Sequence, residues 1–598
     1  MKVRISYVVV MMVLLITSCK KYLETDSPST FTSQYIFQRE DDIFRAVKGI
    51  YALLTQDAGY STRVSFYYTV NSDVEMITGA SDGGRRDIAE FTCGTTNSEV
   101  LNPWNTLYQA IDRANQCIQG IQSSSLYNSD ANVKHMYGEA ITLRALLYYE
   151  LVRNWGDVPF KTTPTVAGDN FYLPRTDRDT ILTHVINDLI AVEPNMFWTD
   201  DPQFAEGIER INRDFVDGLI ARIALARGGY SLHPDMTMKR NADYMTYYKI
   251  ANDYCKRLIA TGKHTLNPSF RQIFLNECQY KYPIDDDVLY EIAFPGTVSS
   301  EVGYYNGVKI ATGSPVGSAS GAIVFPPTYF YSFDTLDTRQ LITCAVYSLD
   351  ANLKQVIVNP AGGITTGKWS KAMMNPPGPG SASTKGTGIN WPLMRYSDVL
   401  LMYAETENEI NNGPTADAKN SLALVRERAF PQSLWPQKVT NYIDSVSANH
   451  DAFFNAIVNE RAWEFGGECI RKFDLVRWNL YGQKIAQARV ALTQMGLDAQ
   501  GTGNGTYSKY PDNVYWILNS DGTLNIKGLY RKVTSVPNGY STQSWLLSLN
   551  GTSGTSFISN AWAGYPDNTG VASVRYILPI HQSVIAASLG SLQNYYNY

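Results

Sequence analysis

Basic residues, cysteines and charge of any kind are scarce in this sequence. Of its 598 residues, 18% are charged, and the formal net charge is −5. This balance gives no support for a nucleic-acid-binding protein, which usually carries a basic excess. The seven cysteines include no C-x-x-C pair, so zinc-ribbon and thioredoxin-like classes are excluded. Beyond the N-terminus no run approaches 18 apolar residues, so we expect no membrane-spanning helix in the mature chain.

Patterns for metals and nucleotides are also missing. The six histidines show no ligand spacing, and the acidic run at 285–287 lacks the calcium-loop pattern. We therefore predict no metal and no cofactor, with a structural calcium left open. Residues 362–369 (GGITTGKW) match part of a phosphate loop, but Trp369 replaces the magnesium-binding Ser/Thr and no helix pattern follows. A nucleotide site is not predicted here.

The N-terminus has the pattern of an export signal. Lys2 and Arg4 precede an apolar run at 8–16, and small residues lead directly to Cys19. This pattern predicts a bacterial lipoprotein signal over 1–18, cleaved before Cys19, whose acyl chains anchor the protein. An ordinary cleaved signal with a chance cysteine is the alternative. Residues 19–30 are polar and are predicted to form a tether.

Aromatic residues are abundant, at 12% with 40 tyrosines, which excludes a disordered chain. Apolar residues recur at helical spacing in several segments, and small residues stand where helices could cross. These segments predict degenerate tetratricopeptide-like hairpins, since no 34-residue register is kept. The predicted helices cover 104–121, 135–155, 180–192, 214–227, 244–259, 397–410 and 415–429.

Two stretches lack helical periodicity. Residues 265–390 are rich in Gly, Pro, Ser and aromatics, and residues 496–566 have a similar texture. Irregular segments of this length are uncommon in compact domains unless they carry function. We predict a mainly α fold over 31–598, with long irregular insertions that build a ligand-binding face. Its parts are an N-terminal helical part (31–264), a loop-rich insertion (265–390) and a C-terminal part (391–598).

Four segments carry a recognisable signature. They read WNTLYQAIDRANQCIQGI at 104–121, GEAITLRALLYYELVRNWGDVPF at 138–160, RYSDVLLMYAE at 395–405 and ERAWEFGGECIRKFDLVRW at 460–478. With these segments the chain resembles the SusD/RagB family of Bacteroidetes outer-membrane nutrient-binding lipoproteins along essentially its whole length. Cys469, Ile470 and His581 depart from the family pattern, which usually has Gly-His and Pro there, and put local packing in doubt.

The resemblance implies a role as well as a fold. It implies a lipid-anchored, surface-exposed outer-membrane protein that captures an oligosaccharide and delivers it to a SusC-type TonB-dependent transporter as its lid, without catalysis. A RagB-like peptide-binding protein is the main alternative. A surface glycoside hydrolase and a peptide-binding adaptor are the other two.

The charged signature invites a catalytic interpretation, which we weighed against a structural one. Glu460 and Glu464 are one helical turn apart and share a face, whereas glycoside hydrolysis needs carboxylates on opposite sides of a cleft. We therefore predict an ion-pair network that joins the late helices, and no enzyme activity.

Ligand contacts are predicted from loop aromatics beside polar groups. Sugars present apolar C–H faces and hydroxyls, and a flat ring beside Asp, Asn or Arg suits both. Most tyrosines, such as Tyr148 and Tyr149, are expected to pack between helices instead. The predicted ligand-binding residues are Tyr67, Asp73, Arg85, Arg86, Tyr304, Tyr305 and Trp369.

Overall fold

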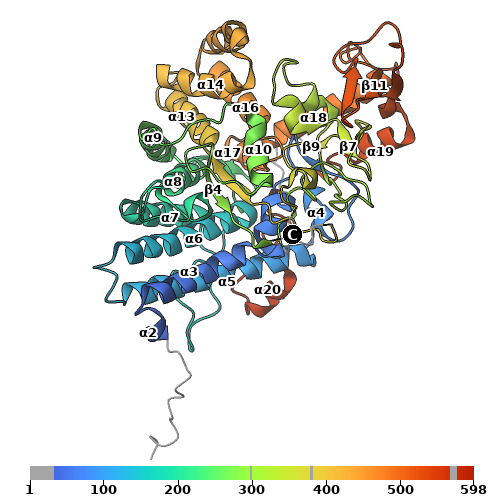
Figure 1. The fold of residues 1–598 in the computed structure, drawn as a ribbon. Helices are drawn as coiled ribbons and strands as arrows, with labels where there is room; N and C mark the ends of the chain where they lie inside the picture. The colour runs from blue at the N-terminus through green and yellow to red at the C-terminus, as the bar shows by residue number, and fades with distance from the viewer. Residues whose placement is uncertain (1–32, 297–298, 378–381, 566–575) are drawn as a thin grey trace, which may run out of the picture.

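The computed structural model describes residues 33–296, 299–377, 382–565 and 576–598. The predicted signal peptide, Cys19 and the tether lie outside these residues. Helices stack along one side of the molecule, while short strands and irregular segments occupy the other (Figure 1). The prediction of a mainly α fold is confirmed.

The helical side is a continuous stack in which each helix packs against the next: α3, α5, α6, α7, α8, α9, α13 and α14. Side chains of Asn97, Asp130 and Asp177 accept hydrogen bonds from first-turn amides of α5, α6 and α7, and so cap them. The seven predicted helices are confirmed, with N-terminal extensions of up to six residues. The bounds are α3 Glu40–Leu54, α5 Ser98–Gln122, α6 Ala131–Trp155, α7 Arg178–Val192, α8 Arg213–Arg227, α9 Tyr244–Ala260, α13 Tyr396–Ile410 and α14 Ala416–Ala429.

The late helices join the early stack because α13 packs on α9 across more than 130 intervening residues. α16 (His450–Phe465) packs against α13 and α14. Along the chain it is followed by α17 (Arg471–Arg477) and α18 (Tyr481–Ala499), each of which packs against the helix before it. Between α16 and α17, Cys469 has a φ of 58°, a conformation that favours glycine, and it is one of the three residues that depart from the family pattern.

The insertions contain more regular structure than the sequence suggested. β4 and β10 pair antiparallel, and β1-β5-β9-β6 and β12-β11-β13 form two further sheets. All five residues of β4 are buried, so it shows no apolar–polar alternation. The strand bounds are β1 Met76–Ile77, β2 Ser231–Leu232, β3 Met238–Lys239, β4 Val288–Ile292, β5 Ile323–Val324, β6 Cys344–Ala345, β7 Tyr347–Leu349, β8 Gln355–Ile357, β9 Thr365–Thr366, β10 Trp391–Arg395, β11 Asn513–Leu518, β12 Leu524–Lys527 and β13 Ser541–Ser544.

Short helices complete the loop-rich side and flank the stack. Two π-helical turns, η2 (Asp57–Ser61) and η3 (Arg63–Tyr67), follow α3 and lead into the strand-rich part. The remaining α-helices are α2 Ser33–Ile36, α4 Arg85–Ala89, α10 Phe270–Cys278, α11 Pro327–Phe330, α12 Gln340–Thr343, α15 Asn441–Val446, α19 Thr552–Asn560 and α20 Gln582–Ala587.

The cysteines in the described part of the chain form no disulfide. All six are buried and free. No helix there is both long and apolar enough to cross a membrane. Nor do three or more His, Cys, Asp or Glu side chains gather there in an arrangement suited to a metal ion.

Candidate functional site

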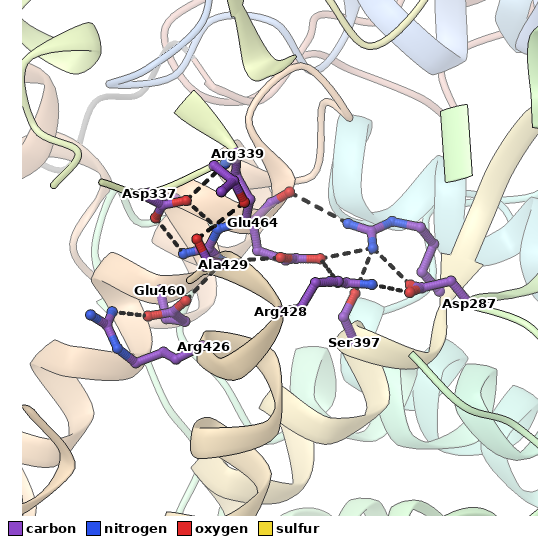
Figure 2. A network of polar contacts seen from close by, with 12 residues as sticks. Asp287, Asp337, Arg339, Ser397, Arg426, Arg428, Ala429, Glu460 and Glu464 are labelled. Carbon is purple, nitrogen blue, oxygen red and sulfur yellow. Dashed lines mark hydrogen bonds and ion pairs between the residues drawn. The ribbon is translucent and has the colours of Figure 1, made fainter. Parts of the chain in front are cut away.

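The charged family signature forms a closed network in the interior. Glu464 on α16 accepts hydrogen bonds from Arg395 at 2.8 Å, from Arg339 at 3.1 Å and from Arg428 at 2.5 Å. Figure 2 shows Glu464 between Arg339 and Arg428. Its side chain is fully buried, and the three guanidinium groups hold the pKa of its carboxyl well below the usual range despite burial. The predicted ion-pair network is confirmed.

Further members of the signature form ion pairs in the same interior. Glu460 pairs with Arg426 at 2.6 Å, and Glu468 pairs with Lys368 at 2.6 Å. Lys368 is the lysine of the phosphate-loop-like run, and its ammonium also donates to the Glu464 carbonyl at 2.9 Å. Because Glu460, Glu464 and Lys368 are fully buried, they are not placed to meet a dissolved substrate.

Two of the predicted ligand-binding residues lie in the scaffold. Asp73 accepts two hydrogen bonds from Arg471 of α17, at 2.8 and 2.9 Å. Trp369 has no exposed surface, and its ring packs against Phe274 and Trp391 at centroid distances of 5.2 and 5.4 Å. Their polar or aromatic groups are engaged in the interior, so we do not carry them into the proposed site.

Four of the predicted residues meet, although up to 238 positions separate them in the sequence. The Arg85 guanidinium, at the start of α4, lies 5.5 Å from the Tyr67 ring centroid and 5.8 Å from that of Tyr305. Tyr305 meets Tyr67 edge-to-face at 5.8 Å and Tyr304 at 5.1 Å. Tyr67 is buried beneath the group, whereas Tyr304, Tyr305 and Arg85 are half-buried. We call Tyr67, Arg85, Tyr304 and Tyr305 the tyrosine–arginine cluster.

The turn that carries Tyr304 and Tyr305 is held on both sides. Amides of both tyrosines donate to the Glu301 carbonyl, at 3.0 and 2.9 Å, and Gly303 supplies a φ of 79°. The Glu301 amide donates to the Ser61 carbonyl at 3.1 Å, which ties the turn to η2. The side-chain amide of Asn306 donates to the Gly467 carbonyl at 2.8 Å, which ties it to the segment after α16. The scaffold thus positions the two rings.

Carboxylates surround Arg85 without saturating it. Asp57, Glu99 and Glu301 each approach its guanidinium at 3.9 Å, beyond hydrogen-bond range. Arg63 binds Glu99 more closely, at 2.6 Å, and also pairs with Asp57. Arg85 Nη1 and Glu301 Oε2 are buried atoms without a hydrogen-bond partner among the described residues. Burial raises the pKa of Glu301 to about 7, against the opposing effect of Arg85.

Arg86 points away from this cluster, although it is adjacent in sequence. Its guanidinium donates to the Thr78 carbonyl at 2.8 Å and to Asp82 at 2.7 Å, within its own loop.

Sequence reasoning missed two members of the site, Glu301 and Lys385. Lys385 lies in the segment 382–388, and its ammonium is 5.6 Å from the Tyr305 centroid and 6.0 Å from that of Tyr304. The segment is held there by Thr387, whose hydroxyl donates to the Val302 carbonyl at 2.8 Å. An exposed lysine in a Gly/Ser-rich run carries no local signal. Glu301, three residues before Tyr304, could have been found by its proximity.

Family models match two parts of this chain. Residues 351–598 match the model described as "SusD family", and residues 21–195 match "Starch-binding associating with outer membrane". Among characterised sequences, SusD-like protein P25 of Formosa agariphila is 24% identical over 516 residues, which is 80% of this chain and 90% of that protein. SusD-like protein P2 of the same organism is 25% identical, over 80% and 91% of the two chains.

Solved structures share the fold. A SusD homologue from Bacteroides thetaiotaomicron superposes with a TM-score of 0.73 at 20% identity, covering 94% of this chain and 98% of that one. Surface glycan-binding protein A from the same organism, in complex with laminarihexaose, superposes with a TM-score of 0.60 at 18% identity, covering 93% and 99%.

Proposed function

Because the chain belongs to the SusD/RagB family, we propose that it is a surface glycan-binding protein and that the tyrosine–arginine cluster is where the glycan binds. The observation that carries this proposal is the convergence of half-buried Tyr304 and Tyr305 with Arg85, which keeps a quarter of its side chain exposed and has no carboxylate within hydrogen-bond range. The rings offer faces for sugar C–H groups, and Arg85 offers donors for hydroxyls. The glycan complex of a protein with the same fold supports the ligand class.

Binding is tested by calorimetry on the soluble chain starting at Lys20, after a glycan array has selected a ligand. We expect a Kd of about 10–100 µM, typical of weak surface capture. Tyr305→Ala should weaken binding about 5- to 30-fold, because the ring loses its stacking surface. Tyr172→Ala is the control, since Tyr172 is an exposed tyrosine that lies outside the cluster.

Equal effects of the two substitutions would refute the cluster as the binding site. Tight binding of peptides without any glycan would favour the peptide-uptake alternative instead. Sustained release of reducing ends by the purified protein would contradict the proposal that it has no catalytic role.

Delivery and anchoring form a second part of the proposal. Cys19 would carry the lipid anchor, and the protein would close over a SusC-type TonB-dependent barrel as its lid. Membership of the family supports this role. Copurification of the full-length protein with a large barrel protein from outer membranes tests it, with Cys19→Ser as the variant that should lose acylation. Failure to recover any barrel protein would count against delivery, and an unmodified Cys19 against the anchor.

A further inference from the structure

Lys385 is the cation of this site that the scaffold leaves unbalanced. It is exposed, and its ammonium forms no hydrogen bond or ion pair with any residue that the structure describes. The backbone of its segment is nevertheless held in place, because Thr387 is buried and hydrogen-bonded to the carbonyls of Ser300 and Val302. The lysine is therefore held over the two rings by its own backbone segment and not by a charge partner.

The charges around the two rings balance in number but differ in exposure. Arg63 takes up Glu99 and Asp57 at closer range than Arg85 does. Glu99 and Glu301 keep only 13% and 12% of their side chains exposed, whereas Arg85 keeps 25% and Lys385 is exposed, so apart from Asp57, which pairs with Arg63, the charges that face solvent are cationic. The ammonium of Lys371, 5.8 Å from the Tyr304 ring, adds to the positive side.

Glu301 balances the charge of Arg85 only incompletely. Its nearest approach to Arg85 is 3.9 Å, and its Oε2 has no hydrogen-bond partner among the described residues. An anionic group that entered from solvent could approach Arg85 and Lys385 together and form charge-assisted hydrogen bonds with both. A neutral sugar could use Arg85 and the rings, but would leave Lys385 without a counter-charge.

Resting on the proposed function, we infer that the glycan bound here is acidic. A carboxylate or sulfate group of a sugar that stacks on Tyr304 or Tyr305 lies between Arg85 and Lys385 and balances their charge. Carboxylate and sulfate share the chemistry that these cations recognise, and the experiment separates the two sources.

The test uses pairs of glycans that differ only in charge. Oligogalacturonate is compared with its methyl ester, and dextran sulfate with dextran, by calorimetry at pH 7.5. Laminarin and xylan serve as neutral probes of glycan binding in general. We expect at least one acidic member to bind about five times or more tighter than its neutral partner, and its affinity to fall with added salt.

Variants then assign the effect to named charges. Lys385→Gln should reduce the acidic-to-neutral preference about three- to tenfold, since it removes one charge-assisted contact. Glu301→Gln should raise that preference about two- to fivefold, since it removes the internal competitor. Lys256→Gln, an exposed lysine on α9, removes the same charge far from the site and should leave the preference unchanged.

The outcomes separate this inference from the proposed function. Binding of laminarin, xylan or dextran without any preference for the acidic partners would overturn the acidic ligand and leave glycan binding intact. Binding of none of the probes would count against both. An effect of Lys385→Gln no larger than that of Lys256→Gln, or a weaker preference in Glu301→Gln, would also overturn the inference. A preference for dextran sulfate alone would assign the group as sulfate, and for oligogalacturonate alone as carboxylate.

Discussion

Two regions of this molecule are built from the same side chains, arginine and glutamate, and use them in opposite ways. In the interior, Glu464 is bonded by three arginines, and every approach is within hydrogen-bond range. At the tyrosine–arginine cluster, Arg85 stands 3.9 Å from each of three carboxylates. The Glu464 carboxylate is thus fully engaged by its partners, whereas Arg85 keeps a quarter of its side chain exposed and has no carboxylate within hydrogen-bond range.

The difference follows from solvent access. A buried charge without close partners is costly, and Glu464, which has no exposed surface, is accordingly bonded by three arginines. Arg85 keeps a quarter of its side chain exposed and therefore can remain incompletely paired. The charged signature segment is thus structural, and the candidate site lies where the ion pairs are longer.

The largest effect should come from opening the interior network. Glu464→Gln leaves three guanidinium groups short of a charge in a buried place, and we expect a loss of about 3–5 kcal/mol in the free energy of unfolding. Urea denaturation measures the loss. Asp512→Asn is the control, since its pair with Lys532 is half-exposed and should cost less than about 1 kcal/mol. Similar losses in the two variants would mean that the buried network stabilises the fold no more than a half-exposed ion pair does.

The next effect should appear at the cluster, on binding and not on folding. Arg85→Gln removes the donors that face the rings and should weaken glycan binding about tenfold, while the free energy of unfolding changes by less than about 1 kcal/mol. Calorimetry and urea denaturation of the same preparation measure the two quantities. A large loss of stability with unchanged binding would mean that Arg85 stabilises the fold and does not contact the ligand.

The pH dependence separates the two regions further. The raised pKa of Glu301, about 7, means that its carboxylate forms as the pH rises from 6 to 8 and then competes for Arg85 and Lys385. An acidic glycan, which stays ionised, should therefore bind about two- to fivefold more weakly at pH 8 than at pH 6. Arg85, Asp57, Lys385 and Arg63 are the charges that face Glu301, and the pKa of Asp57 is lowered, so it stays ionised in this range.

The sign for stability differs between the two glutamates. Glu301 holds an extra proton in the folded state above pH 4.5, so its contribution to stability falls as the pH rises towards 7. The pKa of Glu464 is lowered, so its contribution is full at neutral pH and is lost only in acid, below the usual glutamate range.

Glu301→Gln should abolish the change in glycan affinity between pH 6 and 8. If the change persists in this variant, another group titrates at the site.

The helices could be predicted from the sequence because the residues that define each helix are close together along the chain. Apolar spacing and capping residues such as Asp130 and Asn97 lie within the helices that they define. β4 could not be predicted, since its five buried residues show no alternation and pair with β10 about 100 residues later.

Individual residues of the candidate site could be selected from the sequence, but their assembly could not. Tyr67, Arg85, Tyr304 and Tyr305 stood out as loop aromatics and cations, yet their convergence depends on long-range packing. Asp73 looked equally suitable, because its partner Arg471 lies 398 residues away and no local pattern reports the pair. The composition of a loop therefore selects candidates, and only the tertiary fold sorts them.

The smallest effect should come from the neighbour of Arg85. Arg86 is half-buried and basic as well, but its guanidinium is bonded to Asp82 and to the Thr78 carbonyl. Arg86→Gln should therefore change glycan affinity less than about twofold and the free energy of unfolding by less than about 1 kcal/mol. Calorimetry beside Arg85→Gln compares two adjacent arginines in one loop. A loss as large as that of Arg85→Gln would mean that the ligand displaces Asp82, and that incomplete pairing in the free protein does not identify the residues that bind.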